Sequence, residues 1–296
     1  MRRPIGPTRR EVVQGVAREL SSQGIESSRL EAERLVSTVL DVKPADLLDQ
    51  GGVQLDPATA GRVAMAVARR LNGEPLQHIE GTAEFRSIEL ISDTRALIPR
   101  PETEELVDHI GNWIGKRAPI NRGLDIGTGS GAIALALLDE GLVSHIVGLD
   151  VSQEALAQAK ENIEMSGIEG LELRLCQSDI WSAMLPQDTF GLVVSNPPYV
   201  ASMDWRRLDP KVRDYEPRLA IDGGPDGLKV IRQIISGAAI ALELGGAIFL
   251  EIDSSKGPAV LDLLRSTPGL SEARISPDLS GRSRFASAIK RADLRV

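Results

Sequence analysis

The sequence VVSNPPYV at residues 193–200 sets the fold of the region around it. The apolar run at 190–194 has the composition of a strand that is buried on both faces of a parallel sheet. This strand is expected to end at Asn196, because the two prolines that follow favour neither a strand nor a helix. In open α/β sheets, ligands bind beyond the carboxyl ends of the strands. The sequence therefore predicts that Asn196 lies at a ligand site.

The turn Asn196-Pro197-Pro198-Tyr199 carries groups that could hold a planar ligand bearing an NH2. The Asn196 side chain offers one acceptor and two donors, and the prolines restrict the directions of the neighbouring peptide carbonyls. Tyr199 adds a flat face for stacking. The ligand could be a carboxamide or the exocyclic amine of a base. The alternative interpretation is a turn that merely ends a strand.

Outward from this turn, apolar strands alternate with helices from residue 122 onward. This alternation predicts an α/β fold with a doubly wound, mostly parallel sheet. A final pair of strands could follow near 272–276 and 284–289. The other strands are predicted near 123–126, 146–149, 171–175, 192–194 and 247–251, and the helices near 132–139, 153–166, 228–244 and 256–265.

The first part of the chain predicts helices only, packed as a small all-α N-terminal bundle over residues 1–73. Thr8 and Glu11 form a capping box at a helix start, and the Ser28-x-x-Glu31 segment opens a second helix. Such a bundle could be a structural cap or could recognise a partner. The helical pattern does not separate these two roles.

A change of pattern at residues 74–98 predicts a short hairpin that links the bundle to a catalytic domain over 99–296. Two prolines flank Arg100, and a helix with acidic residues in its first turn is predicted to begin at Pro101. Arg100 could be a solvated residue before this helix, or part of a rigid strap over the active site. The spacing of apolar residues does not distinguish between these two roles of Arg100.

A glycine-rich loop follows the first predicted strand of the sheet. Glycines let the backbone turn tightly and approach a ligand closely, and the helix beyond them presents free N–H groups. The glycine spacing fits neither the G-x-G-x-x-G dinucleotide fingerprint nor a P-loop. Asp125, before the first glycine, could receive a cation or order the loop through hydrogen bonds. We expect a cofactor to be bound by Asp125, Gly127, Thr128, Gly129, Ser130 and Gly131.

Acidic residues recur at the ends of the next two predicted strands. Asp150 could accept hydrogen bonds from both hydroxyls of a ribose. Asp179 could bind the amine of an adenine, with Ile180 and Trp181 packed against the ring. Taken singly, Asp150 could be an N-cap, Asp179 a turn residue and Trp181 a core residue. Together they predict a ligand with a ribose, an adenine and an amino-acid end, and no phosphate.

Composition narrows the classes of function. The net charge of the 296 residues is −8 and lies entirely in residues 101–296, because residues 1–100 hold equal numbers of acidic and basic side chains. An acidic catalytic half argues against nucleic acid as the main ligand.

One cysteine and three scattered histidines predict no disulfide and no metal site. No apolar run is long enough for a membrane span, and the N-terminus lacks a secretory signal. We expect a monomer in the cytoplasm, or in an organelle if the source is eukaryotic.

With these motifs in place, the chain resembles the class I S-adenosylmethionine-dependent methyltransferases, whose pattern matches the glycine loop, Asp150 and the Asn-Pro-Pro-Tyr turn. That turn is shared by adenine-N6 DNA methyltransferases and by protein-glutamine N5-methyltransferases. The helical N-terminal region and the segments 97–104 (LIPRPETE), 216–220 (EPRLA) and 278–282 (DLSGR) resemble the second group, in particular the methyltransferases of peptide chain release factors. One departure is Asp253, where similar proteins often carry glycine.

The resemblance implies methyl transfer from S-adenosylmethionine to the side-chain N5 of the glutamine in the Gly-Gly-Gln motif of release factors, with S-adenosylhomocysteine as the product. It implies that Asn196 and the Pro197 carbonyl accept hydrogen bonds from the substrate NH2, and that Tyr199 stacks on the carboxamide. It places Pro198 in the substrate site and Asn196 next to the cofactor as well. It requires no metal and indicates no general base. The alternatives are an adenine-N6 DNA methyltransferase, a methyltransferase of a ribosomal-protein glutamine, and a non-catalytic adaptor of translation.

Overall fold

The computed structural model describes residues 6–168 and 170–291. The chain divides into two compact units, Met1–Thr82 and Ala83–Val296. The predicted linker, 74–98, is shared between these units. The predicted functional boundaries on either side of that linker stay a prediction.

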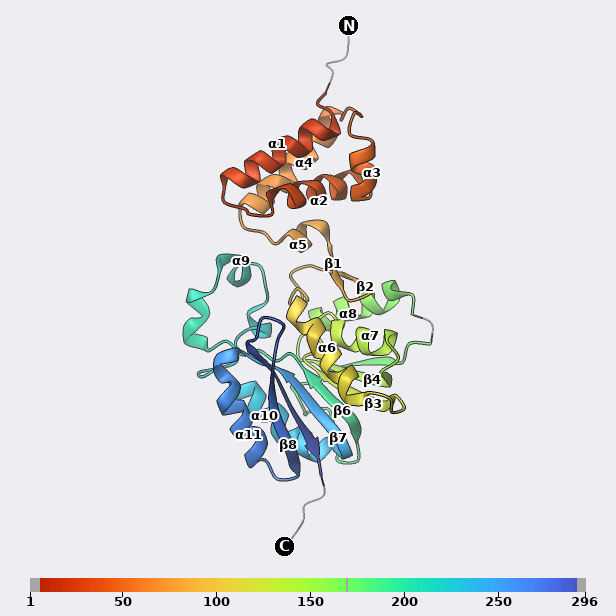
Figure 1. Cartoon of the computed structure of the whole chain (residues 1–296), viewed down its shortest axis with the longest axis vertical. Coiled ribbons are helices and arrows are strands. Elements are labelled where there is room, and N and C mark those ends of the chain that lie inside the picture. The colour runs from red at the N-terminus through yellow and green to blue at the C-terminus, as the bar shows by residue number, and fades with distance from the viewer. Residues whose placement is uncertain (1–5, 169, 292–296) are drawn as a thin grey trace. The chain divides into compact units, whose positions relative to one another are not determined.

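The first unit is a bundle of short helices (Figure 1), as the sequence predicts. Apolar side chains at helical spacing meet in one core, in which Leu20 and Leu35 are fully buried. The polar faces of the helices lie outward, which is the arrangement expected of amphipathic helices in a bundle. The helices are α1 (Arg9–Ser22), α2 (Ser28–Leu40), α3 (Pro44–Asp49), α4 (Pro57–Leu71) and α5 (Leu76–Glu80).

The predicted capping box at Thr8 and Glu11 is confirmed. The Thr8 hydroxyl accepts a hydrogen bond from the Glu11 backbone N–H, and the Glu11 carboxylate accepts one from the Thr8 backbone N–H. Ser28 is the first residue of α2, as the sequence predicts, and the N-cap residue Ser27 makes no capping hydrogen bond with its side chain. The backbone of Ser27 has ψ near 26°, whereas a capping side chain needs an extended backbone.

The second unit is built on a seven-stranded sheet with the strand order β5-β4-β3-β6-β7-β9-β8. Strands β3 to β7 run parallel, and β9 lies antiparallel between β7 and β8. The predicted parallel sheet and its final pair of strands are therefore confirmed. The strands are β3 (Ile120–Ile126), β4 (Val143–Asp150), β5 (Leu173–Gln177), β6 (Phe190–Ser195), β7 (Leu242–Glu251), β8 (Leu270–Pro277) and β9 (Ser283–Lys290), preceded by the hairpin of β1 (Thr82–Phe85) and β2 (Ile88–Ile91).

Helices cover both faces of this sheet (Figure 1). Within β6, Leu192 and Val194 belong to the core formed with α6 and α7, whereas Val193 belongs to the core formed with α10. Because both faces are covered, β6 is apolar up to its last residue, Ser195, which explains why its sequence predicts a buried parallel strand. The helices are α6 (Pro101–Ile114), α7 (Ala132–Asp139) and α8 (Gln153–Ser166) on one face, and α10 (Lys229–Ala241) and α11 (Gly257–Ser266) on the other.

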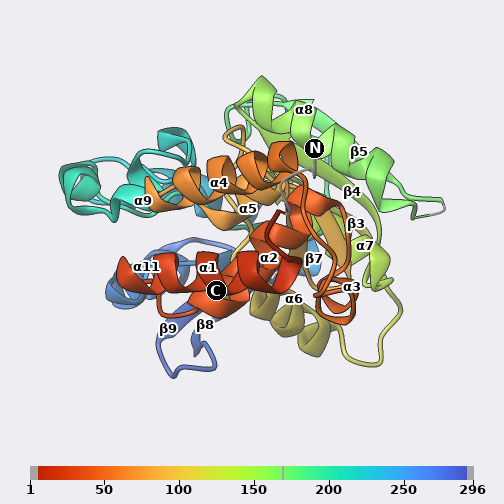
Figure 2. The same cartoon turned by 90° about the horizontal axis from the view of Figure 1, so that it is seen from above.

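The strand order reverses at β3, because β4 and β5 extend the sheet on one side of it and β6 and β7 on the other. At such a switch point the loops after the two central strands diverge and leave a crevice at the carboxyl edge of the sheet. The chain after β6 also makes a long excursion, which includes α9 (Pro210–Arg213), before it enters α10. Figure 2 shows this excursion at one side of the second unit.

Candidate active site

A pocket of about 810 Å³ opens at the carboxyl edge of the sheet, where the switch point predicts it. Its wall comes from the ends of β3, β4, β5 and β6, from the segment before α6 and from the excursion after β6. The predicted site residues that line it are Gly127, Thr128, Gly129, Ser130, Asp150, Asp179, Ile180, Asn196 and Pro198. The other predicted site residues, Asp125, Gly131, Pro197 and Tyr199, are also described by the structure but do not line it.

The glycine loop after β3 turns back over the end of β4. Gly127, Gly129 and Gly131 all have positive φ, a conformation that only glycine adopts without cost. A Cβ on Gly127 would meet no atom within 4 Å, so this position faces open space at the pocket. The backbone N–H groups of Gly127 and Thr128 both donate to the Leu149 carbonyl, which anchors the loop on β4.

Asp125, near the carboxyl end of β3, orders this loop. Its side chain is fully buried, and its Oδ2 accepts a hydrogen bond from the Thr128 hydroxyl at 2.7 Å. Burial raises the pKa of Asp125 to about 7, with a smaller upward contribution from Asp150, although the Thr128 hydrogen bond opposes both. Of the two roles left open by the sequence, these contacts favour ordering of the loop over direct contact with a cationic ligand.

Asp150, at the end of β4, presents its carboxylate to the pocket. One oxygen accepts a hydrogen bond from Gly129 N and the other from Ser152 N, both at 2.9 Å. Burial raises the pKa of Asp150, and these backbone hydrogen bonds oppose that shift. The N-cap of α8 is Ser152, whose hydroxyl accepts from Ala155 N. Asp150 is therefore held rigidly at the pocket by two backbone donors and is not itself the cap.

The turn after β5 contributes Asp179 and Ile180 to the pocket. Ile180 has φ of 53°, which is a strained conformation for a β-branched residue. Strain of this kind persists where the surrounding structure fixes it, often at ligand sites. Asp179 is exposed at the pocket rim.

Trp181 packs against α10 and does not line the pocket, so the prediction that it packs against an adenine is wrong. Its indole Nε1 donates to the Gln233 carbonyl at 2.9 Å. The ring covers Gly237, where a Cβ would lie only 2.1 Å from Nε1. The space left by this glycine and the hydrogen bond to the Gln233 carbonyl hold the partly buried ring against α10.

Replacing Gly237 by alanine is expected to displace the Trp181 ring and to lower the free energy of unfolding by about 1–3 kcal/mol, the usual cost of overpacking. Urea denaturation of the full chain measures this change. Gly111→Ala in α6 is the matched control, because a Cβ there would lie 3.6 Å from the nearest atom, an ordinary contact. That control should be neutral or stabilising, since alanine favours helices. Equal destabilisation by both substitutions would contradict the prediction.

The turn after β6 holds Asn196 at the pocket. The preceding Ser195 is fully buried, and its hydroxyl donates to the Ile126 carbonyl at 2.6 Å, which joins the ends of β6 and β3. The Asn196 Nδ2 donates to the Thr103 hydroxyl at 3.1 Å. Tyr199 packs partly into the core, and burial raises its pKa to about 12. Its phenol is therefore neutral near neutral pH, and its stacking role stays a prediction.

The segment before α6 lines one side of the pocket, including residues 95–100. Arg100 Nη2 binds Glu216 Oε1 at 2.5 Å, and Glu216 is only 5% exposed. Burial raises the pKa of Glu216, while Arg100 opposes that shift. Since Arg100 joins this segment to the excursion after β6, the contact favours the strap over a solvated helix start. The local sequence contains no signal that pairs residues so far apart.

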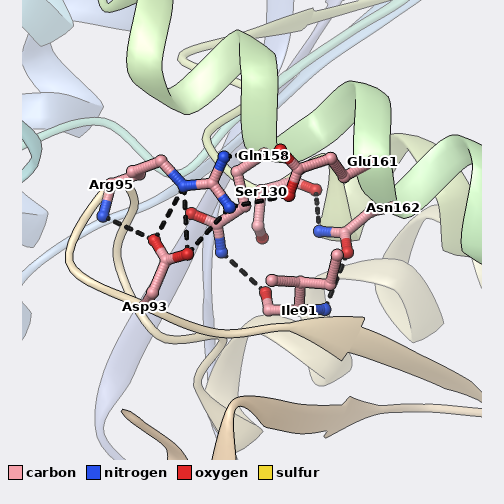
Figure 3. Close-up of polar contacts among 7 residues, drawn as sticks. All are labelled: Ile91, Asp93, Arg95, Ser130, Gln158, Glu161 and Asn162. Atoms are coloured by element: carbon pink, nitrogen blue, oxygen red, sulfur yellow. Dashed lines mark hydrogen bonds and ion pairs between the residues drawn. The ribbon is translucent and has the colours of Figure 1, made fainter.

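Side chains of α8 form hydrogen bonds that connect the β1–β2 hairpin to the glycine loop in the pocket wall (Figure 3). Asn162 Oδ1 accepts from Ile91 N at 2.7 Å, and its Nδ2 donates to the Ser130 carbonyl at 2.8 Å. Gln158 Nε2 donates to the Ile91 carbonyl at 2.6 Å. Both side chains are almost fully buried. These bonds fix the loop carbonyl of Ser130 relative to β2, a connection that the sequence analysis missed.

Arg95, which lines the pocket, is also connected to α8 by an ion pair (Figure 3). Its guanidinium binds Glu161 at 2.7 Å and Asp93 at 2.8 Å. The hydrogen bonds to Glu161 and Asp93 raise the pKa of Arg95. The side chain is therefore a fixed cation whose charge is already matched by two carboxylates. It anchors the start of the strap to α8.

These groups fit a nucleoside with free ribose hydroxyls and an amine. A rigid carboxylate at Asp150 can accept from vicinal hydroxyls, and the exposed carboxylate of Asp179 can accept from an amine. The open space at Gly127 lets a ligand lie against the backbone of the loop. The pocket is also of the size common for small-molecule sites. S-adenosylmethionine has each of these features.

Two families match the chain: the PrmC N-terminal domain at residues 11–81 and the methyltransferase small domain at residues 103–208. The release factor glutamine methyltransferase of Deinococcus radiodurans is 37% identical to this chain and aligns with 94% of it and 97% of the relative. The chain belongs to the release factor glutamine methyltransferase family. The resemblance of the motifs to this family is thus confirmed.

Other members of the family align equally fully. The release factor glutamine methyltransferase of Moorella thermoacetica is 37% identical over 97% of this chain and 100% of the relative, and that of Streptomyces coelicolor is 36% identical over 95% and 97%. Among solved structures, the hMettl16 catalytic domain is similar with a TM-score of 0.54 at 16% identity, over 80% of this chain and 82% of that one. This likeness concerns the fold alone, and it confirms the class I methyltransferase fold.

Proposed function

We propose that this chain transfers a methyl group from S-adenosylmethionine to the side-chain N5 of the glutamine in the Gly-Gly-Gln motif of peptide chain release factors. Membership of the release factor glutamine methyltransferase family supports the proposal. The observation that carries it is the carboxamide of Asn196, which lines the pocket at the carboxyl end of β6. A primary amide on a substrate can form hydrogen bonds with such a group.

The chain's own residues would bind and orient the reactants. The cofactor, when bound, supplies an electrophilic methyl group on a sulfonium. Asp150 would hold the ribose hydroxyls, and Asp179 with Ile180 would hold the adenine. The backbone of Gly127 would allow close approach of the amino-acid end. The position of each of these residues on the pocket wall supports the proposed roles.

An amide nitrogen is a poor nucleophile because its lone pair is delocalised into the carbonyl. The Asn196 Oδ1 and the Pro197 carbonyl would accept hydrogen bonds from the substrate NH2 and thereby orient its nitrogen. These oxygens would also stabilise the positive charge that develops there as the new N–C bond forms. One proton leaves the nitrogen to solvent when the product becomes neutral. Pro198 and Tyr199 would complete the substrate side of the turn.

The proposal includes action as a monomer in the cytoplasm. None of the helices in the described part of the chain is long and apolar enough to cross a membrane. Among the same residues, no group of three or more His, Cys, Asp or Glu side chains could hold a metal ion. The acidic net charge of −8 supports a protein substrate over nucleic acid.

Mass spectrometry of a purified release factor, incubated with the full chain and S-adenosylmethionine, tests the proposal. We expect a gain of one methyl group, about 14 Da, on the glutamine of Gly-Gly-Gln. A release factor in which this glutamine is replaced by alanine is the matched control. Transfer to a ribosomal-protein glutamine or to DNA adenine, with none to the release factor, would replace this proposal by the corresponding alternative.

A further inference from the structure

Three side chains form a hydrogen-bonded chain that reaches from the pocket wall, where Asn196 and Thr103 lie, into the protein interior. Asn196 Nδ2 lies 3.1 Å from the Thr103 hydroxyl oxygen, and that hydroxyl lies 2.7 Å from Glu251 Oε2. Thr103 is 4% exposed and Glu251 is 1% exposed. Thr103 is in the first turn of α6 and Glu251 ends β7, so two rigid elements hold the chain.

The direction of these hydrogen bonds follows from the chemistry of the groups. An ionised carboxylate can only accept, so the Thr103 hydroxyl must donate its single proton to Glu251. That hydroxyl can then only accept from Asn196, which requires the amide nitrogen of Asn196 to face it. The Asn196 oxygen is thereby turned away from Thr103.

We infer that Thr103 and Glu251 are positioning residues that orient the Asn196 amide, with its nitrogen toward Thr103 and its oxygen toward the substrate amide. This inference rests on the proposed function, because only a substrate that donates N–H groups requires the oxygen to face it. With the amide reversed, two NH2 groups would meet in the pocket and no hydrogen bond would form. The pair thus selects the productive one of two nearly isosteric orientations.

The protonation state of Glu251 bears on this orientation. Burial raises the pKa of Glu251 to about 7, while the Thr103 hydrogen bond opposes the shift. Protonated Glu251 can donate to the Thr103 hydroxyl, which frees the hydroxyl proton to donate to the Asn196 oxygen and reverse the amide. The ionisable groups that act on Glu251 are Arg284 of β9, Arg100 and Glu102 at the start of α6, and Tyr199 after β6.

The pair of variants Thr103→Val and Thr103→Ser tests the inference. Valine keeps the shape but removes both hydrogen bonds, and we expect kcat for release factor methylation to fall about 10- to 100-fold, the scale of effect expected from misorientation. The affinity for S-adenosylmethionine, measured by calorimetry, and the KM for the release factor should change by less than about threefold. Serine keeps the hydroxyl and should restore kcat to within a few-fold of the parent.

Thr189→Val is the matched control. Thr189 also donates to a glutamate, Glu243, but at the amino end of the sheet and on the protein surface. This variant should leave kcat unchanged. If Thr103→Val kept the parent kcat, or if valine and serine lowered kcat, cofactor affinity and the melting temperature together, the positioning role would be overturned.

Glu251→Gln gives a second readout, the pH profile of kcat. In the parent, kcat is expected to fall as the pH decreases through about 7, because protonation of Glu251 permits the reversed amide. Glutamine does not titrate and can donate or accept, so Glu251→Gln should have a lower kcat at pH 8 and no acidic limb from this group. An unchanged limb in this variant would assign the titration to another residue, such as the buried Asp125, and would contradict the role of Glu251.

The orientation can also be measured without turnover, which separates a failure of this inference from a failure of the proposed function. The side-chain NH2 signals of Asn196 in a nitrogen–proton NMR spectrum are assigned by their loss in Asn196→Asp. We expect one of the two protons to be protected from solvent exchange in the parent and in Thr103→Ser, and unprotected in Thr103→Val. Equal protection in all three would overturn the inference, whichever protein or nucleic acid proves to be the substrate.

Discussion

Replacing Asn196 by alanine is expected to lower kcat for methyl transfer by at least about 100-fold, the scale seen when one oriented group that stabilises the transition state is removed. The variant loses the oxygen that would accept from the substrate NH2, and it loses the hydrogen bond to Thr103. The pocket wall formed by the glycine loop and Asp150 remains. Binding of S-adenosylmethionine, measured by calorimetry, should therefore weaken by no more than a few-fold.

Asn121→Ala is the matched control for this loss. Asn121 lies in β3 near the amino edge of the sheet and is exposed, so its side chain is remote from the pocket. The control should keep the parent kcat and cofactor affinity. Near-normal turnover of Asn196→Ala would show that its carboxamide does not hold the substrate. A parallel loss of cofactor affinity would show instead that Asn196 acts mainly by shaping the cofactor pocket.

The sequence predicts the parts of this site that depend on one strand and the turn after it. Asn196 and Asp150 each follow an apolar run that is recognisable as a buried strand. Because parallel strands point their carboxyl ends to one edge, these residues must converge on that edge once the strands are found. The structure brings both to one pocket with the glycine loop. The pattern of apolar residues and the topology of a parallel sheet are therefore sufficient to predict that Asn196 and Asp150 lie at one site.

The sequence does not predict the contacts that join distant elements. Thr103 meets Glu251 across 148 positions, and Arg100 meets Glu216 across 116. The local sequence around each glutamate does not show that its side chain is buried. Burial of a charged side chain requires a partner, and here each partner lies more than 100 positions away. Trp181 shows the same limit, because its packing against α10 depends on the space at Gly237, which lies 56 positions further along the chain.

Replacing Asp150 by alanine is expected to weaken binding of S-adenosylmethionine by at least about 100-fold, since hydrogen bonds to a charged group contribute about 1.5–3 kcal/mol each. The carboxylate would accept from two ribose hydroxyls, and it already fixes Gly129 N and Ser152 N at 2.9 Å. Alanine removes both sets of bonds, so the glycine loop loses the acceptor that orients it. Calorimetric titration with S-adenosylmethionine measures the loss.

Asp150→Asn tests the carboxylate with less change in side-chain shape. Asparagine keeps one acceptor oxygen but presents an NH2 to one of the two backbone donors, so we expect a loss of affinity between those of the parent and the alanine variant. Asp262→Ala, which removes an exposed carboxyl from α11, controls for the change in net charge and should bind the cofactor as the parent does. If Asp150→Ala bound the cofactor normally, the carboxylate would serve only the fold of the loop, and the variant should then be less stable but still active at saturating cofactor. A loss of affinity in the folded variant, with kcat preserved at saturation, is the result that assigns Asp150 to cofactor binding, directly at the ribose or through the glycine loop that it orients.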